Sequence, residues 1–313
     1  MTCYAPAYYP RFACIADRCR HSCCIGWEID VDEDTLQLYD ALTGGYGEVI
    51  AASIEGREEC PHFCLGQGER CPHLNERGLC RIILTLGEDY LCDICREHPR
   101  FYHQTPHGRE VGLGMACEEA CRLILTSEDG SCFVAVDEDD EDAPAEVDFD
   151  ATAERARIYE ILADATRTYA QQLSDIEQLW GAAPTALTEE ESRELLRSLE
   201  YMNEDNRARF AMDYRADGET PDALTVPLRR ALIYFIFRHA SAAESREDFA
   251  AALCLCLFLE RLLCSLATSA AAYELPALID VARTLSEEIE YSEDNTAAIR
   301  EALRRAFGEQ EPF

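Results

Sequence analysis

The chain has 313 residues, of which 48% are hydrophobic, a composition typical of a globular protein that buries its own core without disulfide staples. Its 61 acidic and 28 basic residues give a formal charge of −33, which argues against nucleic-acid partners because these are bound mainly through basic side chains. All 28 basic residues are arginine, so chemistry that needs a lysine base or a lysine Schiff base is excluded.

The N-terminal segment shows no basic stretch followed by an apolar one, which an export signal would require. The longest apolar run begins at Ala251 and is broken by Glu260 and Arg261, short of the ~18 residues that a membrane span needs. We therefore expect a cytoplasmic protein with no membrane partner. In that reducing compartment, the 17 cysteines are not expected to form a disulfide framework.

Fourteen of the cysteines and six of the seven histidines lie within residues 1–132. The thiols form closely spaced groups: Cys14/Cys19/Cys23/Cys24, Cys60/Cys64, Cys71/Cys80, Cys92/Cys95 and Cys117/Cys121. The two-residue spacing in CDIC lets Cys92 and Cys95 reach one metal from a single turn. Apolar residues are scattered in this region, so bound metal is the expected organiser, because its binding free energy adds to folding.

Thiolates without regularly paired histidines favour zinc or an iron–sulfur cluster over hard cations. Disulfides and ordinary buried thiols are the alternatives that compartment and spacing disfavour. The adjacent Cys23 and Cys24 point in different directions in any regular structure, so they cannot easily serve one metal together. Trp27 would shield the sulfurs from water, and Cys60 and Cys64, which flank His62, are candidates for an additional site.

In the cysteine-rich region, short helices are expected at residues 33–42, 80–98 and 117–127. Residues 134–150 carry nine acids and no base from Asp137 onward, which is typical of a solvated linker. Beyond it, apolar residues recur at helical intervals in 154–180, 187–202, 225–241, 246–273 and 292–307. Thr188 and Glu191 have the spacing of a capping box.

The helix at 246–273 is apolar on all faces, so it is expected at the centre of a bundle with Cys254, Cys256 and Cys264 as small hydrophobic residues. His239 is expected to be a hydrogen-bonded histidine near a helix end. The predicted fold is mainly α. An irregular, metal-organised cysteine-rich domain (1–133) and an acidic linker (134–150) precede a C-terminal helical bundle (151–313).

Three blocks then resemble a known family: APAYYPRFACIADRCRHSCCIGWEIDVDE, RCPHLNERGLCRIILTLGEDYLCDICREHPRFY and GMACEEACRLIL. They are similar to the flagellin lysine-N-methylase (FliB-type) family, which is related to a wider group of cysteine-rich zinc- or iron-chelating proteins. The likeness is dense across residues 4–125 and thin afterwards. It implies an enzyme that transfers methyl groups from S-adenosylmethionine to lysines of flagellin, or of another lysine-bearing protein, and that holds an iron–sulfur cluster.

The resemblance carries over nine cysteines as metal ligands: Cys14, Cys19, Cys23, Cys24, Cys71, Cys80, Cys92, Cys95 and Cys117. A four-iron, four-sulfur cluster takes four of them, and zinc is the alternative metal.

Catalytic residues and S-adenosylmethionine-binding residues stay unassigned. TGGYG at Thr43 and VGLG at Val111 predict turns, and Tyr8–Tyr9 and Glu97–Arg100 are the first places to look for groups that orient the lysine. Two other readings stay open: a zinc-stabilised binding module, and a metal-handling or electron-transfer protein without methylase activity.

Overall fold

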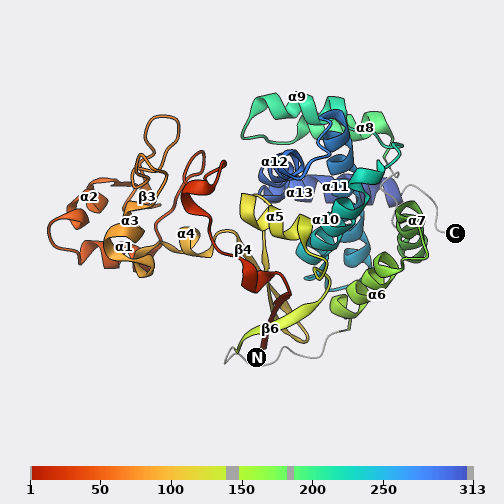
Figure 1. The fold of residues 1–313 in the computed structure, drawn as a ribbon, viewed down its shortest axis with the longest axis horizontal. Helices are drawn as coiled ribbons and strands as arrows, with labels where there is room; N and C mark the ends of the chain where they lie inside the picture. The colour runs from red at the N-terminus through yellow and green to blue at the C-terminus, as the bar shows by residue number, and fades with distance from the viewer. Residues whose placement is uncertain (1, 139–147, 182–186, 309–313) are drawn as a thin grey trace. The chain divides into compact units, whose positions relative to one another are not determined.

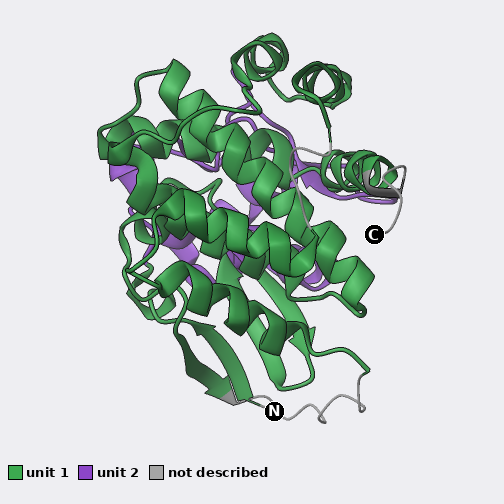
Figure 2. Cartoon of the chain, turned by 90° about the vertical axis from the view of Figure 1, so that its right-hand side faces the viewer, with its two compact units in different colours: residues 1–12, 101–313 green, residues 13–100 purple. Residues whose placement is uncertain are grey.

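The computed structural model describes residues 2–138, 148–181 and 187–308. The chain divides into two compact units (Figure 2): unit 1 comprises residues 1–12 and 101–313, and unit 2 comprises residues 13–100. Unit 2 is therefore an insertion in the chain of unit 1. Residues 101–133, which were predicted with the cysteine-rich domain, are grouped with the helices of unit 1.

Unit 1 is mainly helical and contains one four-stranded sheet (Figure 1). Its strands are β1 (Thr2–Pro6), β4 (Arg100–Thr105), β5 (Gly108–Leu113) and β6 (Phe133–Glu138). Its α-helices are α5 (Glu118–Thr126), α6 (Ala151–Ala163), α7 (Tyr169–Trp180), α8 (Glu189–Ser198), α9 (Glu204–Asp213), α10 (Asp222–Ala240), α11 (Arg246–Ser269), α12 (Leu275–Leu285) and α13 (Glu293–Gly308). A π-helical turn (Ser286–Glu290) follows α12.

The sheet has the strand order β4-β5-β1-β6. Strand β1 pairs in parallel with β5, where Cys3 lies opposite Arg109, and antiparallel with β6, where Pro6 lies opposite Phe133. The mainly helical class is confirmed, but the sheet was not predicted. The predicted acidic linker begins as strand β6, and its residues 139–147 lie outside the described residues.

Most helices of unit 1 lie where the apolar periodicity places them. The range 154–180 forms two helices rather than one, because Thr168 starts α7 with a capping box that it shares with Gln171. The predicted capping box of Thr188 is confirmed: its hydroxyl accepts from the Glu191 N–H, and the Glu191 carboxylate accepts from the Thr188 N–H at 2.8 Å. Helices α9 and α12 were not predicted.

Helix α11 is the core of unit 1. By length and composition it could cross a membrane, but 83% of its most apolar 18-residue window is buried inside the structure, as in the central helix of a bundle. Cys254, Cys256 and Cys264 are at most 2% exposed, which confirms their role as small hydrophobic residues. Helix α10 packs along α11, and α12 and α13 also contact it.

One carboxylate, Glu260, is buried within α11 and accepts a hydrogen bond from the Tyr169 hydroxyl at 3.0 Å. Burial raises the pKa of Glu260 from 4.5 to about 7. Because the folded chain keeps this proton where the unfolded chain loses it, the free energy of unfolding should fall by ~1.4 kcal/mol per pH unit across this interval.

We therefore expect Glu260→Gln to match the parent protein near pH 4.5 and to be more stable by ~3 kcal/mol at pH 7 and above. Denaturant unfolding of both proteins between pH 4 and 8 measures the difference. The exposed Glu244→Gln is the control and should follow the parent at every pH. Parallel profiles for the parent and Glu260→Gln would contradict the assignment.

Unit 2 consists of short elements around a small core. They are α1 (Glu33–Asp40), α2 (Tyr46–Ala52), α3 (Arg81–Leu86), α4 (Asp93–Glu97), β2 (Ile54–Glu55) and β3 (His62–Phe63). The helix expected at 80–98 is split because Gly87 ends α3 and a 3₁₀ turn (Glu88–Tyr90) precedes α4. The buried core of unit 2 includes Tyr39, Phe63, Cys71 and Cys92. Whether residues 1–133 and 151–313 fold independently stays a prediction.

Candidate metal centre

The segment CPHLNERGLC forms a closed loop that carries Cys71 at one end and Cys80 at the other. Asn75 closes it: its side-chain oxygen accepts from the N–H groups of Arg77 and Leu79 at 2.8 and 3.0 Å. The Asn75 N–H in turn donates to the Leu79 carbonyl at 2.9 Å. The local hydrogen bonds of one asparagine thus bring two distant thiols back toward each other.

Cys92 and Cys95 lie at the start of α4. Cys92 is the residue before the helix, and the Cys95 N–H donates to its carbonyl at 3.0 Å. Because residues three apart share a helix face, both thiols point the same way and are hydrogen-bonded to each other. The CDIC pair therefore converges as its spacing predicts.

Five thiols from three segments gather in unit 2, and we call them the five-thiol group: Cys24, Cys71, Cys80, Cys92 and Cys95. The Cys71 N–H donates to the Cys24 carbonyl at 2.8 Å, which joins the first segment to the loop. The thiols of Cys24, Cys80 and Cys92 all lie close enough to raise the pKa of Cys71 electrostatically. Cys24 and Cys71 likewise act on Cys95.

Within the five-thiol group, hydrogen bonding lowers the pKa of one thiol, whereas burial raises the pKa of others. The thiol of Cys23 donates to Cys24 and is the main cause that lowers the pKa of Cys24 to about 7, with a smaller effect of Arg70. Burial raises the pKa of Cys71 to about 12 and also raises that of Cys80. Metal binding would therefore have to release protons from the buried thiols, which makes affinity depend on pH.

Backbone N–H groups donate hydrogen bonds to two sulfurs of the five-thiol group and would stabilise them as thiolates. The His73 N–H donates to the Cys71 sulfur, and the N–H groups of Ile82 and Ile83 donate to the Cys80 sulfur at the start of α3. Each donor opposes the effect of burial by lowering the pKa of the thiol that it contacts. Such donors are the ordinary environment of sulfurs that ligate metal.

Sequence reasoning did not identify the residues that hold the five-thiol group in place. His73 is 1% exposed and bonds the Tyr46 hydroxyl at 2.7 Å and the Ser53 hydroxyl at 2.9 Å. Burial lowers the pKa of His73 to about 4, so the ring is neutral and structural. Tyr39, whose hydroxyl donates to the Tyr90 carbonyl at 2.6 Å, lies beside Cys80, Cys92 and Cys95. In the sequence, the only indication that His73 holds the five-thiol group in place is its position two residues after Cys71.

The other four predicted ligands have different surroundings. Cys23 is exposed and adjoins the group through its bond to Cys24, whereas Cys14 is exposed in the preceding segment. The Cys19 thiol donates to the His21 carbonyl at 3.2 Å. Cys117 belongs to unit 1, where it precedes α5. The ligand role of all nine cysteines stays a prediction.

The five-thiol group contains enough thiols for either of the two expected metals, because a zinc ion and a four-iron cluster each take up to four thiolates. In the described part of the chain, no three His, Cys, Asp or Glu side chains already converge on one point as ligands of a single ion. The identity of the metal stays a prediction.

A second buried polar network surrounds the GMAC block in unit 1. The Met115 N–H donates to the Tyr234 hydroxyl at 3.1 Å, and this hydroxyl donates to Glu290 at 3.2 Å. His239 bonds the other oxygen of Glu290 at 2.8 Å, which confirms it as a hydrogen-bonded histidine in the last turn of α10. A Cβ on Gly114 would stand 2.3 Å from the Tyr291 hydroxyl, so a larger residue there would displace the Tyr291 side chain.

The segments in which lysine-orienting groups were expected do not support a catalytic role for their residues. Tyr8 is 2% exposed in the core of unit 1, and burial raises its pKa above the ordinary value. Burial lowers the pKa of His98 to about 4, which makes it a weak base at pH 7. The TGGYG segment forms the turn before α2, whereas Val111 to Leu113 lie in β5 rather than in a turn.

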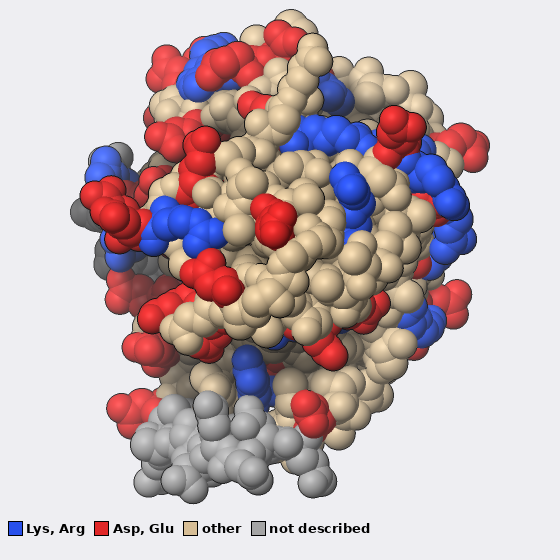
Figure 3. All heavy atoms as spheres, turned by 90° about the vertical axis from the view of Figure 1, so that its left-hand side faces the viewer, with Lys and Arg blue, Asp and Glu red and all other residues tan. Residues whose placement is uncertain are grey.

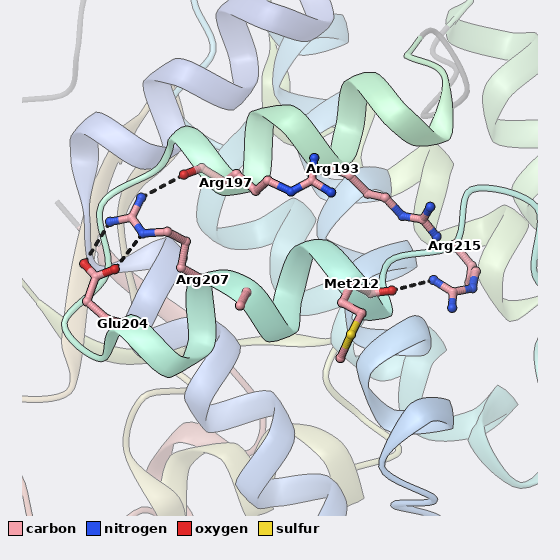
Figure 4. Close-up of a pocket in the computed structure, with 7 residues that line it drawn as sticks. Arg193, Arg197, Glu204, Arg207, Met212 and Arg215 are labelled. Atoms are coloured by element: carbon pink, nitrogen blue, oxygen red, sulfur yellow. Dashed lines mark hydrogen bonds and ion pairs between the residues drawn. The ribbon is translucent and has the colours of Figure 1, made fainter.

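A hollow of about 630 Å³ lies between α8 and α9 in unit 1 (Figure 4). It is lined by Arg193, Arg197, Glu204, Ala208, Arg207, Met212 and Arg215. Arg207 forms a two-pronged pair with Glu204, and Arg197 pairs with Glu190 at 3.2 Å. Four guanidinium groups would repel a sulfonium cation, so the size of this hollow does not make it a site for S-adenosylmethionine.

No family model matches the chain, but curated relatives do. Two proteins named lysine-N-methylase, from Salmonella typhimurium and Salmonella choleraesuis, are 33% and 32% identical over 138 residues, which cover 41% of this chain and 34% of each relative. The flagellar biosynthetic protein FliU of Salmonella muenchen is 32% identical over 138 residues, which cover 80% of FliU. The chain thus spans about a third of the two methylases and most of FliU. No solved structure matches.

Proposed function

Because the chain belongs to the FliB/FliU-type flagellin lysine-N-methylase family, we propose that it is a protein-lysine N-methyltransferase that uses S-adenosylmethionine and an iron–sulfur cluster. The observation that carries the proposal is the likeness to proteins named lysine-N-methylase. The gathering of five thiols in unit 2 adds independent support for the cluster.

The reaction defines what the protein must do. The lysine nitrogen attacks the methyl carbon, a nitrogen–carbon bond forms, and the carbon–sulfur bond breaks with its electron pair remaining on sulfur. The products are methyl-lysine and S-adenosylhomocysteine, and the proton lost by the amine passes to solvent or to a base. The amine must be neutral to attack, so the protein has to bind lysine and favour its deprotonated form.

The charge of the chain suits a lysine-bearing substrate. Acidic side chains are spread over the face drawn in Figure 3, and the whole chain carries a formal charge of −33. Such a surface raises the local concentration of basic side chains by long-range attraction. We expect flagellin, or another lysine-bearing protein met in the cytoplasm, as the partner.

The five-thiol group would hold the cluster. A four-iron cluster that leaves one iron open takes three thiolates, so two of the five would stay outside its coordination. When bound, such a cluster would supply the open iron to hold the amino and carboxylate groups of S-adenosylmethionine. His73, fixed between Tyr46 and Ser53, keeps the Cys71–Cys80 loop in place for this role.

The proposal is tested with full-length protein purified without oxygen. We expect a brown protein that absorbs near ~400 nm, contains iron and sulfide, and adds methyl groups to flagellin lysines when S-adenosylmethionine is present, as mass spectrometry measures. The Cys92→Ser/Cys95→Ser variant should lose the iron and the methylation together. The exposed Cys132→Ser, outside the predicted ligand set, is the matched control and should keep both.

Two outcomes would contradict the proposal. A colourless protein that contains zinc and methylates nothing would show a zinc-stabilised binding module. A brown protein that leaves flagellin unmethylated would show a metal-handling or electron-transfer protein.

A further inference from the structure

The hollow between α8 and α9 concentrates positive charge in a chain that is acidic as a whole (Figure 4). Four of the seven residues that line it are arginine and one is glutamate, whereas the chain has 61 acids and 28 bases. Arg193 and Arg197 are four residues apart on α8, so their side chains leave the same face of that helix. Arg207 lies on α9, and Arg215 follows the end of α9. Guanidinium groups from separate elements thus meet at one hollow.

One of the four, Arg207, is committed to contacts within the chain. Its Nε and Nη2 donate to the Glu204 carboxylate at 2.7 and 2.9 Å. Its Nη1 donates to the carbonyls of Arg197 and Leu199 at 2.8 and 2.6 Å. These bonds tie the end of α8 to the start of α9. We therefore expect Arg207 to maintain the shape of the hollow rather than to bind a ligand.

The other three guanidinium groups keep unused donors, since each carries five N–H bonds. In the described residues, Arg215 pairs with no carboxylate and donates only to backbone carbonyls, in two bonds of 2.7 Å. Arg197 forms one ion pair, with Glu190 at 3.2 Å. The Nε of Arg193 is shielded from water and has no acceptor in the described part of the chain. An anion in the hollow would supply acceptors to these groups.

The carboxylates beside the hollow indicate what kind of anion could compete for these donors. Glu190 lies 3.2 Å from Arg197 and 4.0 Å from Arg193, and Glu189 pairs with Arg193 at 2.5 Å. A ligand with a single carboxylate would only exchange one such pair for another. A chain of phosphates carries more charge and directs oxygens to several sides, so it can accept from α8 and from Arg215 together.

The hollow is large enough for more than an isolated phosphate. Its volume of about 630 Å³ falls within the ~300–1,000 Å³ of small-molecule sites. Ala208 and Met212 add apolar surface beside the guanidinium groups, and Met212 is 65% exposed. A methionine side chain adapts readily to the shape of a bound group. A ligand with both a charged and an apolar part would therefore find contacts for each.

We propose that the hollow between α8 and α9 binds a phosphate chain of the kind that a nucleoside triphosphate carries, held by Arg193, Arg197 and Arg215. Binding is reversible and makes or breaks no covalent bond. The proposal does not depend on methyltransferase activity. The hollow belongs to unit 1, whereas the five-thiol group belongs to unit 2.

Titration calorimetry of the full-length protein, in buffer without divalent cations, tests the proposal. The probes are ATP and inorganic tripolyphosphate, with adenosine and citrate for comparison. We expect one site for ATP, weaker binding as the salt concentration rises, much weaker binding of citrate and none of adenosine. Tighter binding of ATP than of tripolyphosphate would identify a nucleotide as the ligand, whereas equal binding would identify the phosphate chain alone.

Arginine variants locate the site. Arg197→Gln and Arg215→Gln should each weaken the binding of ATP by about tenfold, because each removes a charged hydrogen-bond donor. Arg197 is 49% exposed, so its replacement should leave the far-ultraviolet circular dichroism unchanged. The matched control is Arg157→Gln on α6, which removes an exposed arginine that also pairs with a glutamate and should bind ATP like the parent.

A variant with the opposite expected effect separates binding from stability. Glu190→Gln removes the carboxylate that competes for Arg197 and Arg193, so it should tighten the binding of ATP. Glu194→Gln, exposed on the same helix and outside the hollow, removes the same charge and should change the affinity much less.

Four results would overturn the proposal. They are the absence of ATP binding to the parent, binding of adenosine as tight as that of ATP, binding of citrate as tight as that of tripolyphosphate, and full affinity in both Arg197→Gln and Arg215→Gln.

Discussion

Removal of the metal proposed for the five-thiol group is expected to unfold residues 13–100 and to leave α10 and α11 folded. The helices of unit 2 are only five to eight residues long, too short to be stable alone. Its core is small and includes two of the thiols. Because the free energy of metal binding adds to the folding free energy of a small domain, the stability lost with the metal should exceed what such a core supplies.

Hydrogen exchange measured by mass spectrometry resolves the two units. After chelation, peptides that cover residues 71–98 should exchange at the rate of an unfolded chain, while peptides from α11 stay protected. Cys92→Ser/Cys95→Ser should behave like the chelated protein, and Cys132→Ser should not. Protection that persists in 71–98 after metal is removed would mean that apolar packing alone organises unit 2.

The second large effect concerns a buried ion pair in unit 1. Arg155 and Glu110 are 2% and 4% exposed and meet in two parallel bonds of 2.6 and 2.8 Å. Arg155 also donates to the Ser241 hydroxyl and lies over the Phe133 ring, 4.5 Å from its centroid. This one guanidinium therefore joins β5, the start of β6, α6 and the end of α10.

Arg155→Met should lower the free energy of unfolding by about 3–5 kcal/mol, because it leaves the Glu110 carboxylate buried without a counter-charge. The melting temperature should fall on the order of 10 °C for a chain of this size. Differential scanning calorimetry of the parent and the variant measures both.

The double variant Glu110→Leu/Arg155→Met separates charge from packing. It removes both charges and should recover most of the lost stability, since a buried ion pair can often be replaced by apolar side chains of similar volume. A double variant as unstable as Arg155→Met would show that the contacts of Arg155 with Ser241 and Phe133 matter more than its charge.

Most helices of unit 1 could be predicted from sequence because their signals are local. The apolar face of α11 and the Thr188 capping box each depend on residues within a few turns of one another. The convergence of Cys92 with Cys95 is local in the same way, since both belong to one helical turn. Such features need no knowledge of the rest of the fold.

The sheet and the division into units could not be predicted because their contacts are distant in sequence. Strand β1 has five residues, and its partners β5 and β6 begin more than a hundred positions later. The pattern of residues within TCYAP gives no indication of the strands with which it pairs. Helix α5 was predicted, but its place against α10 and α12 depends on the bundle and not on its own residues.

The candidate site was predicted only in part for a related reason. Motif spacing identifies thiols, but the polar residues that fix them are scattered. His73 is held by Tyr46 and Ser53 from another helix and the turn after it, and Glu290 in the π-helical turn meets Tyr234 from α10. These partners become visible only when the chain is folded.

The insertion of unit 2 behind β1 has a consequence for biosynthesis. A chain that emerges from the ribosome N-terminus first presents β1 long before its parallel neighbour β5 exists, because Cys3 pairs with Arg109. Residues 13–100 are complete in that interval, so unit 2 can fold, together with the metal proposed for it, before β1 is paired. The order of synthesis thus allows the inserted unit to form before the strand that precedes it meets its parallel partner.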